Sequence, residues 1–439
     1  MMGCDLGTLF KLTVAGGSYQ DGLTVHLQGV PPGLLITEEE IYEDLLIRKP
    51  GQGELTSPRR EPDIPLIYNG INAADTIPGF SNALHTNGTP MVILIPNLDR
   101  HFEHIHQYQV TNRTPRPGHA SYASYMKYDH WDDAIGAGIF SGRYTSTIVA
   151  AGVVAKRILA AHGIQVTAYV REAAGVAMPE MPLETIRARA AAYRKVRKEH
   201  DPIWHFVFKS GRIKPGMRFL EKTPVLKEVE DMIGRFASIP MDEERIKREH
   251  GVHPELFCPD LPTAERMYER IVEIKKAGDS SGGLVEVQAT GVPVGVGEPV
   301  FRKLDGELGR MLSIGAVKAV EIGAGVGVKD MTGYSCNDQL FVDAQGRVGF
   351  KSNHAGGITG GLATGQTIIA RVAVKPTPTI SKDQDTIDKV DRTNQVLKAV
   401  TRRDPTLVAR IWPVVEAFTA VILVDHLMMH KGYQAMWRA

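Results

Sequence analysis

The 439-residue chain is nearly neutral, with 51 lysines and arginines against 50 aspartates and glutamates. This balance supplies no long-range field for nucleic acid or an anionic membrane, so neither partner is expected. Three scattered cysteines are too few for a disulfide framework or a zinc cage, and no charged region followed by an apolar run marks the chain for export. We therefore expect a cytoplasmic protein.

Polar and apolar residues alternate, as in strands, in both halves of the chain. Residues 24–28 and residues 283–290 each follow this pattern and lead into a Gly-Val-Pro turn. This repeated strand and turn predict an internally duplicated α+β core with two sheets. The alternative is chance similarity of two short turns. No Gly/Ser-rich or Pro-rich linker divides the sequence, so we expect a single large domain over residues 1–439.

Helices are predicted around these strands. Residues 145–162 are rich in alanine, and residues 263–277 carry an apolar stripe opposite charged residues, as an amphipathic helix requires. The longest apolar stretch, residues 411–429, is interrupted by two carboxylates and a histidine. Burying these groups in lipid would be costly, which favours a packed core helix over a membrane span.

The segment 178–254 is more charged than the rest of the chain. It includes an arginine- and lysine-rich run over residues 187–198, for which a solvated helical face is a simpler explanation than a nucleic-acid stripe. We interpret the segment as an enlarged helical insertion that serves as a lid, an oligomer contact or neutral decoration.

Three familiar motifs can be set aside. Residues 278–282 fit Gly-x-Ser-x-Gly, but a helix is predicted before them and a strand after them, the reverse of a nucleophile elbow. Residues 323–327 approach a dinucleotide fingerprint, yet Val328 occupies the third glycine position. Metal-capable side chains at 101, 103, 104 and 106 match no closed zinc spacing, so no metal is expected.

The most informative segment is 352–380. Two adjacent glycine pairs leave backbone amides open to a flat ring or a phosphate, and an apolar strand, a Lys-Pro-Thr cluster and the Arg-x-Asp-Pro of 402–405 follow. In this order, together with Arg-Arg-Glu-Pro-Asp at 59–63 and Arg-Pro-Gly-His-Ala at 116–120, the chain resembles the chorismate synthase family over nearly its whole length.

The resemblance implies a fold and an activity. The family fold is a β-α-β sandwich with helices between two antiparallel sheets, assembled as a homotetramer, and residues 384–435 would form a C-terminal active-site loop and helix. The family reaction is the 1,4-anti elimination of phosphate from 5-enolpyruvylshikimate 3-phosphate to chorismate, with reduced FMN and no net redox change. Because nothing identifies a nicotinamide site, an external flavin reductant is expected.

The resemblance also assigns site residues. His119 is expected near the pyrimidine end of the flavin, balancing its anionic charge, and Asp404 is expected to act with flavin N5 in removing the proton. Each has a structural alternative, since His119 could cap a turn and Asp404 could begin a helix. The other expected cofactor-binding residues are Ser141, Asn353, Ala355, Gly356, Gly357, Lys375, Thr377 and Thr379. The expected ligands of the anionic cyclohexene carboxylate substrate are Arg48, Arg116, Arg143 and Arg402, with surface ion pairing as the alternative for any one arginine.

The chain departs from the family pattern where chemistry is expected. Gly-Glu-Ser-His-Gly is replaced by residues 16–20, Gly-Gly-Ser-Tyr-Gln, so that Tyr19 occupies the position of an acid-base histidine. A tyrosine, with an ordinary pKa of about 10, is a much weaker acid. Two alternatives therefore stay open. One is a diverged paralogue that performs a related flavin-assisted elimination or dehydration on another shikimate-type substrate, and the other is a flavin-binding protein without turnover.

Overall fold

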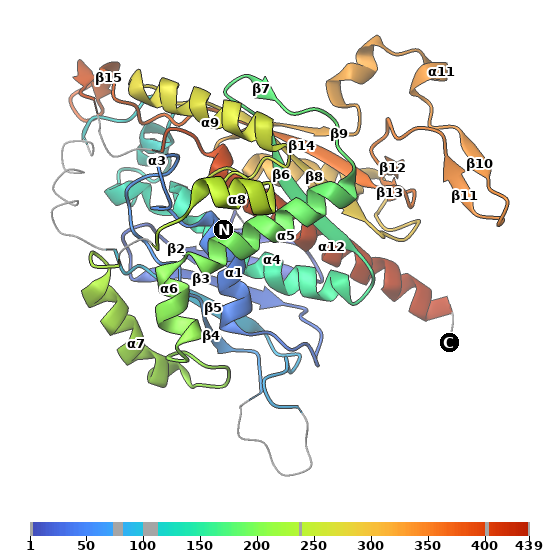
Figure 1. Cartoon of the computed structure of the whole chain (residues 1–439), viewed down its shortest axis with the longest axis horizontal. Coiled ribbons are helices and arrows are strands. Elements are labelled where there is room, and N and C mark those ends of the chain that lie inside the picture. The colour runs from blue at the N-terminus through green and yellow to red at the C-terminus, as the bar shows by residue number, and fades with distance from the viewer. Residues whose placement is uncertain (1–2, 73–81, 100–112, 237–238, 400–403, 438–439) are drawn as a thin grey trace.

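The computed structural model describes residues 3–72, 82–99, 113–236, 239–399 and 404–437. Two five-stranded sheets, in which all neighbouring strands are antiparallel, form its framework (Figure 1). In spatial order, the first sheet contains β1 (Asp5–Leu6), β2 (Lys11–Gly16), β3 (Gly22–Gln28), β5 (Met91–Pro96) and β4 (Leu66–Asn69). The second contains β7 (Val176–Ala177), β6 (Gln165–Ala173), β8 (Gly283–Thr290), β14 (Ile368–Val374) and β9 (Val317–Ile322).

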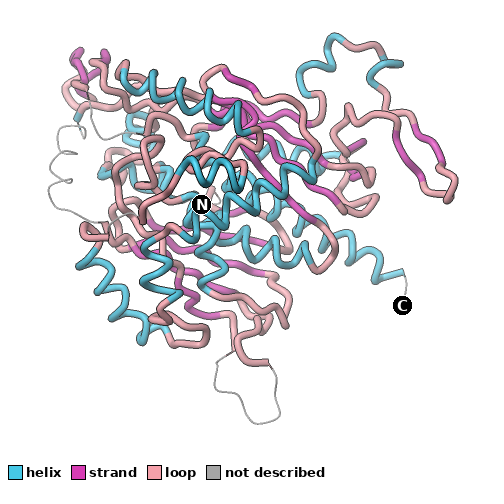
Figure 2. The backbone as a smooth tube through the Cα atoms, in the orientation of Figure 1, coloured by secondary structure: helices cyan, strands magenta, loops and turns pink. Residues whose placement is uncertain are grey.

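Further short strands and helices surround this framework (Figure 2). Three two-stranded pairs are β10–β11 (Leu340–Val342, Val348–Phe350), β12–β13 (Ile358–Thr359, Leu362–Ala363) and β15–β16 (Gln384–Asp388, Thr393–Leu397). The helices are α1 (Glu38–Arg48), α3 (Ser121–Lys127), α4 (Thr145–Ala160), α5 (Leu183–Glu199), α6 (Pro202–Trp204), α7 (Phe219–Met232), α8 (Glu243–His250), α9 (Leu261–Lys276), α10 (Leu304–Gly309), α11 (Gly333–Cys336) and α12 (Val408–Trp437). The helices expected at 145–162 and 263–277 correspond to α4 and α9, and the expected strands correspond to β3 and β8.

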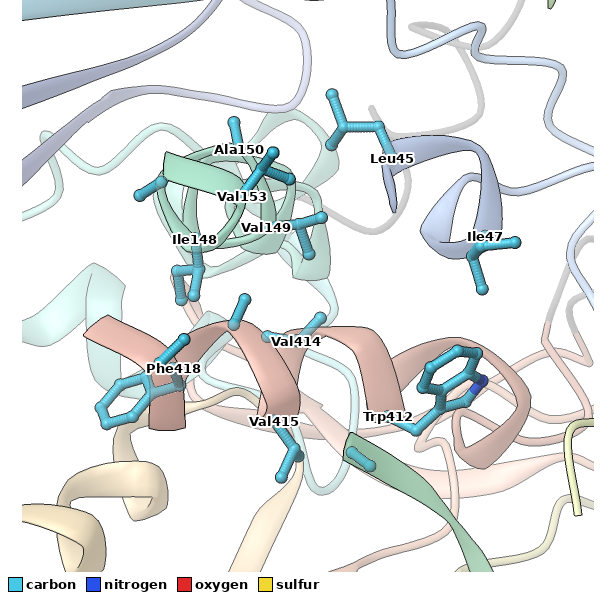
Figure 3. Close-up of a cluster of buried hydrophobic side chains, with 14 of the residues drawn as sticks. Leu45, Ile47, Ile148, Val149, Ala150, Val153, Trp412, Val414, Val415 and Phe418 are labelled. Atoms are coloured by element: carbon cyan, nitrogen blue, oxygen red, sulfur yellow. The ribbon is translucent and has the colours of Figure 1, made fainter. Parts of the chain in front are cut away.

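The core lies where α4 and α12 meet between the two sheets. Helix α4 contacts β3 and β5, α12 contacts β6 and β8, and the two helices contact each other extensively. Figure 3 shows apolar side chains of both helices, with Leu45 and Ile47 of α1, gathered at this contact. A Cβ at Gly152 of α4 would lie 2.2 Å from the Cβ of Ala417, so glycine permits the close approach. An α+β fold with antiparallel sheets is thereby confirmed.

Helix α12 is a core helix, as the sequence predicts. It is long and apolar enough to cross a membrane, but 94% of its most apolar window is buried inside the protein. Its buried carboxylates have partners. Glu416 accepts hydrogen bonds from Lys156 at 2.7 Å and from the amide of Ala168 at 3.0 Å, and Asp425 accepts from the amides of residues 8–10 at 2.7–3.0 Å. Internal partners thus replace the water that these charges lose.

The segment 178–254 contains α5 to α8, but the charged run on α5 does not form the solvated helical face that the sequence predicts. Arg194 forms ion pairs with Asp44 and Glu416, and Arg197 is buried, donating to the carbonyl of Pro254 at 3.0 Å. Desolvation lowers the pKa of Arg194, but the neighbouring carboxylates from α1 and α12 outweigh it and raise the pKa. Arg194 and Arg197 thus have structural roles, because their partners come from distant segments.

Candidate active site

His119 lies just before α3 in a cluster of basic side chains. Its Nε2 is 3.2 Å from Nη2 of Arg116, and Lys375, which directly follows β14, donates to the carbonyl of Gly118. Arg116 also donates to Oγ1 of Thr379 at 3.4 Å. These contacts bring together four residues that the sequence assigned to one site.

The electrostatics of this cluster keep His119 neutral. Burial, followed by repulsion from Arg116 and Lys375, lowers the pKa of His119 to about 4. Because arginine can only donate, Nε2 must accept and Nδ1 must carry the proton. That Nδ1–H is buried and has no hydrogen-bond partner among the described residues. An unpaired buried donor beside two cations is suited to an anionic, oxygen-bearing group.

Asp404 lies where three segments meet. Its Oδ1 accepts from the amide of Ser57 at 2.8 Å and from Arg410 at 2.7 Å, and its backbone carbonyl accepts from Thr377 at 2.7 Å. Arg410 lies in the first turn of α12 and donates through Nε to the carbonyl of Arg48 at 2.9 Å. Sequence reasoning missed Arg410, although its place six residues after Asp404, at the start of a predicted core helix, was a usable signal.

The segment after α9 contacts the residues on both sides of this site, Thr377 and Pro405. Ser280 donates to the carbonyl of Thr377 at 2.8 Å, and the amide of Ser281 donates to the carbonyl of Pro405 at 2.9 Å. Because α9 precedes these serines and β8 follows them, the nucleophile-elbow interpretation is excluded, as expected.

Arg48 and Arg143 share one buried carboxylate. Both form ion pairs with Asp63, which is fully buried, and Arg143 also donates to Asn97 at 2.8 Å. Burial lowers the pKa of Arg48 well below its ordinary range and that of Arg143 to about 9. These side chains therefore hold the framework of the site together, and their contact with substrate stays a prediction. Ser141, at the start of the short helix that contains Arg143, accepts from the Arg143 amide at 3.3 Å.

Tyr19 lies in the turn between β2 and β3. Its ring contacts the backbone of Gly136, where a Cβ would lie 2.4 Å from Cδ2, and the guanidinium carbon of Arg59 is 5.3 Å from the ring centroid. The neighbouring amide of Ser18 donates to the carbonyl of Gly138 at 3.3 Å. Gly136 thus makes room for Tyr19.

The glycine segment does not join this group within one chain. Asn353 accepts from the amide of Gly357 at 2.6 Å, and the amide of Gly356 donates to the carbonyl of Asn353 at 3.1 Å, both beside the first residues of β14. Ala355 donates to Asp338 at 2.9 Å. Lys375 follows the other end of this seven-residue strand, about 20 Å away at the usual rise per residue.

Two sequence expectations fall outside the described residues. Arg402 is one, and the metal-capable side chains of the 101–106 loop are the other. Within the described part of the chain, no group of three or more histidine, cysteine, aspartate or glutamate side chains could hold a metal ion.

The fold and the site together define an α+β protein with a site rich in arginine, lysine and histidine at one end of β14. Residues 10–428 match the family model for chorismate synthase. The chorismate synthase of Acetivibrio thermocellus is 36% identical over 452 residues, covering 99% of this chain and 97% of that protein, and that of Methanococcoides burtonii is 36% identical with 99% and 98% coverage. The chain belongs to the chorismate synthase family.

A solved structure agrees with this assignment. A crystal structure of chorismate synthase superposes with a TM-score of 0.62 and covers 97% of this chain and 94% of its own, at 23% sequence identity. At that level of identity the superposition shows the fold alone. The family relationship rests on the full-length sequence similarity.

Proposed function

We propose that the protein eliminates phosphate from 5-enolpyruvylshikimate 3-phosphate to give chorismate, with reduced FMN as cofactor. The observation that carries the proposal is the neutral His119, whose unpaired Nδ1–H lies beside Arg116 and Lys375. The segment that begins at Lys375 also contacts Asp404, through Thr377. Full-length relatives at 36% identity support the same activity.

The basic cluster fits FMN. Lys375, Thr377, Thr379 and Ser141 would hold it, and His119 would donate to a flavin oxygen and compensate its negative charge. When bound, FMN supplies electron density to the substrate ring and takes it back. An external reductant would keep it reduced.

The elimination needs a base and a route for the leaving group. Asp404 is proposed to take the ring proton as the ring C–O bond breaks and its electron pair leaves with phosphate. Ser57 and Arg410 hold one oxygen of this carboxylate and fix its direction. Both hydrogen bonds are to Oδ1, so Oδ2 accepts from neither Ser57 nor Arg410, which suits it to proton transfer.

We infer that the glycine segment serves a neighbouring subunit of a homotetramer. Asn353, Ala355, Gly356 and Gly357 lie at the opposite end of β14 from Lys375, about 20 Å along the strand. The segment around α11, β10 and β11 projects from the body of the protein (Figure 1) and exposes Leu340, Val342, Val348 and Tyr334. An exposed apolar projection of this kind is typical of a subunit contact.

The two halves of the chain support the proposed duplication. Strands β3 and β8 are each third in their five-stranded sheet. Each is followed by a glycine at positive φ, Gly29 at 77° and Gly291 at 76°, with a neighbouring backbone carbonyl about where a Cβ would lie. We propose, in addition, a cytoplasmic protein with one domain over residues 1–439, an insertion at 178–254 and an active-site loop and helix at 384–435.

The test is anaerobic release of phosphate and chorismate with chemically reduced FMN, with oxidised FMN as control. We expect turnover only with reduced FMN, lost in His119→Ala and in Asp404→Asn. Absence of turnover despite FMN binding, with turnover restored by Tyr19→His, would indicate a paralogue with another substrate. Absence of turnover in all variants would indicate a flavin-binding protein.

A further inference from the structure

The ring of Tyr19 has a fixed place beside Arg59. The 5.3 Å distance from guanidinium carbon to ring centroid is within the range of a cation–π contact. Gly136, at φ +60°, leaves the space that the ring fills. The ring of Tyr19 is therefore fixed in place and orients the guanidinium of Arg59.

Arg59 is held by its two terminal nitrogens. Nη1 donates to Oγ of Ser18 at 3.1 Å, and Nη2 donates to the carbonyl of Ser18 at 3.2 Å and to Glu61 at 3.0 Å. Nε is buried and has no hydrogen-bond partner among the described residues. A buried guanidinium N–H without an acceptor is costly, and an arriving oxyanion would satisfy it.

The surrounding charges favour an anion at this point. Arg59 is close enough to Arg48 and Arg143 that its repulsion, after burial, contributes to lowering the pKa of both. The ion pairs here join four guanidinium groups with three carboxylates, namely Arg48, Arg59, Arg143 and Arg410 with Glu61, Asp63 and Asp404. One further negative charge would balance this set.

We propose that Arg59 receives the phosphate that leaves the substrate, through its unpaired Nε, and that Tyr19 is the positioning residue that orients Arg59. The inference rests on the proposed function. When the C–O bond breaks, both electrons remain on the phosphate oxygen, so the group departs as an anion and needs a cation more than a proton. A tyrosine hydroxyl is a weak acid near neutral pH, whereas a guanidinium remains charged.

Four variants separate positioning from proton donation. Tyr19→Phe keeps the ring, Tyr19→Leu removes it, and Arg59→Gln removes the cation. Arg60→Gln is the matched control, because Arg60 is exposed and donates to the carbonyl of Gly234. We expect kcat within about 3-fold of wild type, with an unchanged pH profile, for Tyr19→Phe and for the control, and roughly 30-fold losses for the other two. A loss of about 100-fold or more in Tyr19→Phe would indicate an acid and overturn the inference.

Calorimetric titration with inorganic phosphate tests the site without turnover. We expect the dissociation constant to rise at least about 10-fold in Arg59→Gln and to stay unchanged in Tyr19→Phe and Arg60→Gln. Equal binding by wild type and Arg59→Gln, or no binding by wild type, would overturn the inference. Phosphate binding through Arg59 without turnover of the enolpyruvyl substrate would instead contradict the proposed function, while the anion site at Arg59 would be supported.

Discussion

FMN binding should take up a proton at His119, so that cofactor affinity depends on pH. In the structure, burial and the charges of Arg116 and Lys375 lower the pKa of His119 to about 4. An anion bound between these groups cancels the repulsion and favours imidazolium. The pKa of His119 should then return toward its ordinary value of about 6.5.

The size of the effect follows from these two values. If the pKa rises from about 4 in the free protein to about 6.5 in the complex, the affinity should increase about 30-fold between pH 8 and pH 5. In the free protein, the lowered pKa of His119 makes folding stability fall at low pH, whereas FMN affinity rises at low pH. Because the folded-state pKa is below the unfolded value, the stability contributed by neutral His119 is complete above about pH 6.5 and is lost as pH falls toward 4.

The assay is fluorescence titration of FMN at pH 5, 6, 7 and 8 on wild type and His119→Asn. The phosphate of FMN titrates near pH 6 and favours binding at high pH, but this contribution is common to both proteins and cancels in their ratio. We expect the wild-type advantage to grow about 30-fold toward pH 5. A ratio that is constant across this range would refute the placement of the cofactor anion against His119.

Three further predictions concern the framework. Asp63→Asn should lower the free energy of unfolding by about 3–5 kcal/mol, because two buried arginines lose their shared carboxylate, and the urea midpoint should fall accordingly; an unchanged midpoint would contradict this. Asp425→Asn should weaken the hydrogen bonds from the amides of residues 8–10 and lower the free energy of unfolding by about 3 kcal/mol. Hydrogen exchange of these amides should therefore accelerate in Asp425→Asn and stay unchanged in the control Asp330→Asn, where the aspartate is exposed. Gly136→Ala should displace Tyr19, because its Cβ would overlap the ring, and should reduce turnover while circular dichroism stays native; full activity would refute the contact.

Local patterns in the sequence were sufficient to predict much of the fold. Alternation predicts β3 and β8, because a strand with one buried face leaves a period of two in the sequence. The long apolar run predicts α12 as a core helix, because a helix that is apolar all round is a buried one. The ion pairs of Arg194 could not be predicted in this way. Its partners, Asp44 and Glu416, are distant in sequence and meet it only in the folded chain.

The candidate site was predictable in composition and only partly in arrangement. Short motifs identify His119, Lys375 and Asp404, and the structure brings their segments together. The glycine segment is close to Lys375 in the sequence, yet the extended strand β14 separates the two, so that they lie at its opposite ends. Sequence motifs predict which residues serve the family chemistry, whereas strand length decides which of them meet within one subunit.

The central claim is that the site around His119 and Asp404 performs a flavin-dependent elimination. The most direct test is anaerobic stopped-flow mixing of 5-enolpyruvylshikimate 3-phosphate with the native protein and reduced FMN, recording flavin absorbance and phosphate release in a single turnover. We predict a substrate-dependent flavin transient that rises before phosphate appears and decays as chorismate forms. Phosphate release without any flavin transient, or a protein that binds reduced FMN and substrate and releases no phosphate, would contradict the account.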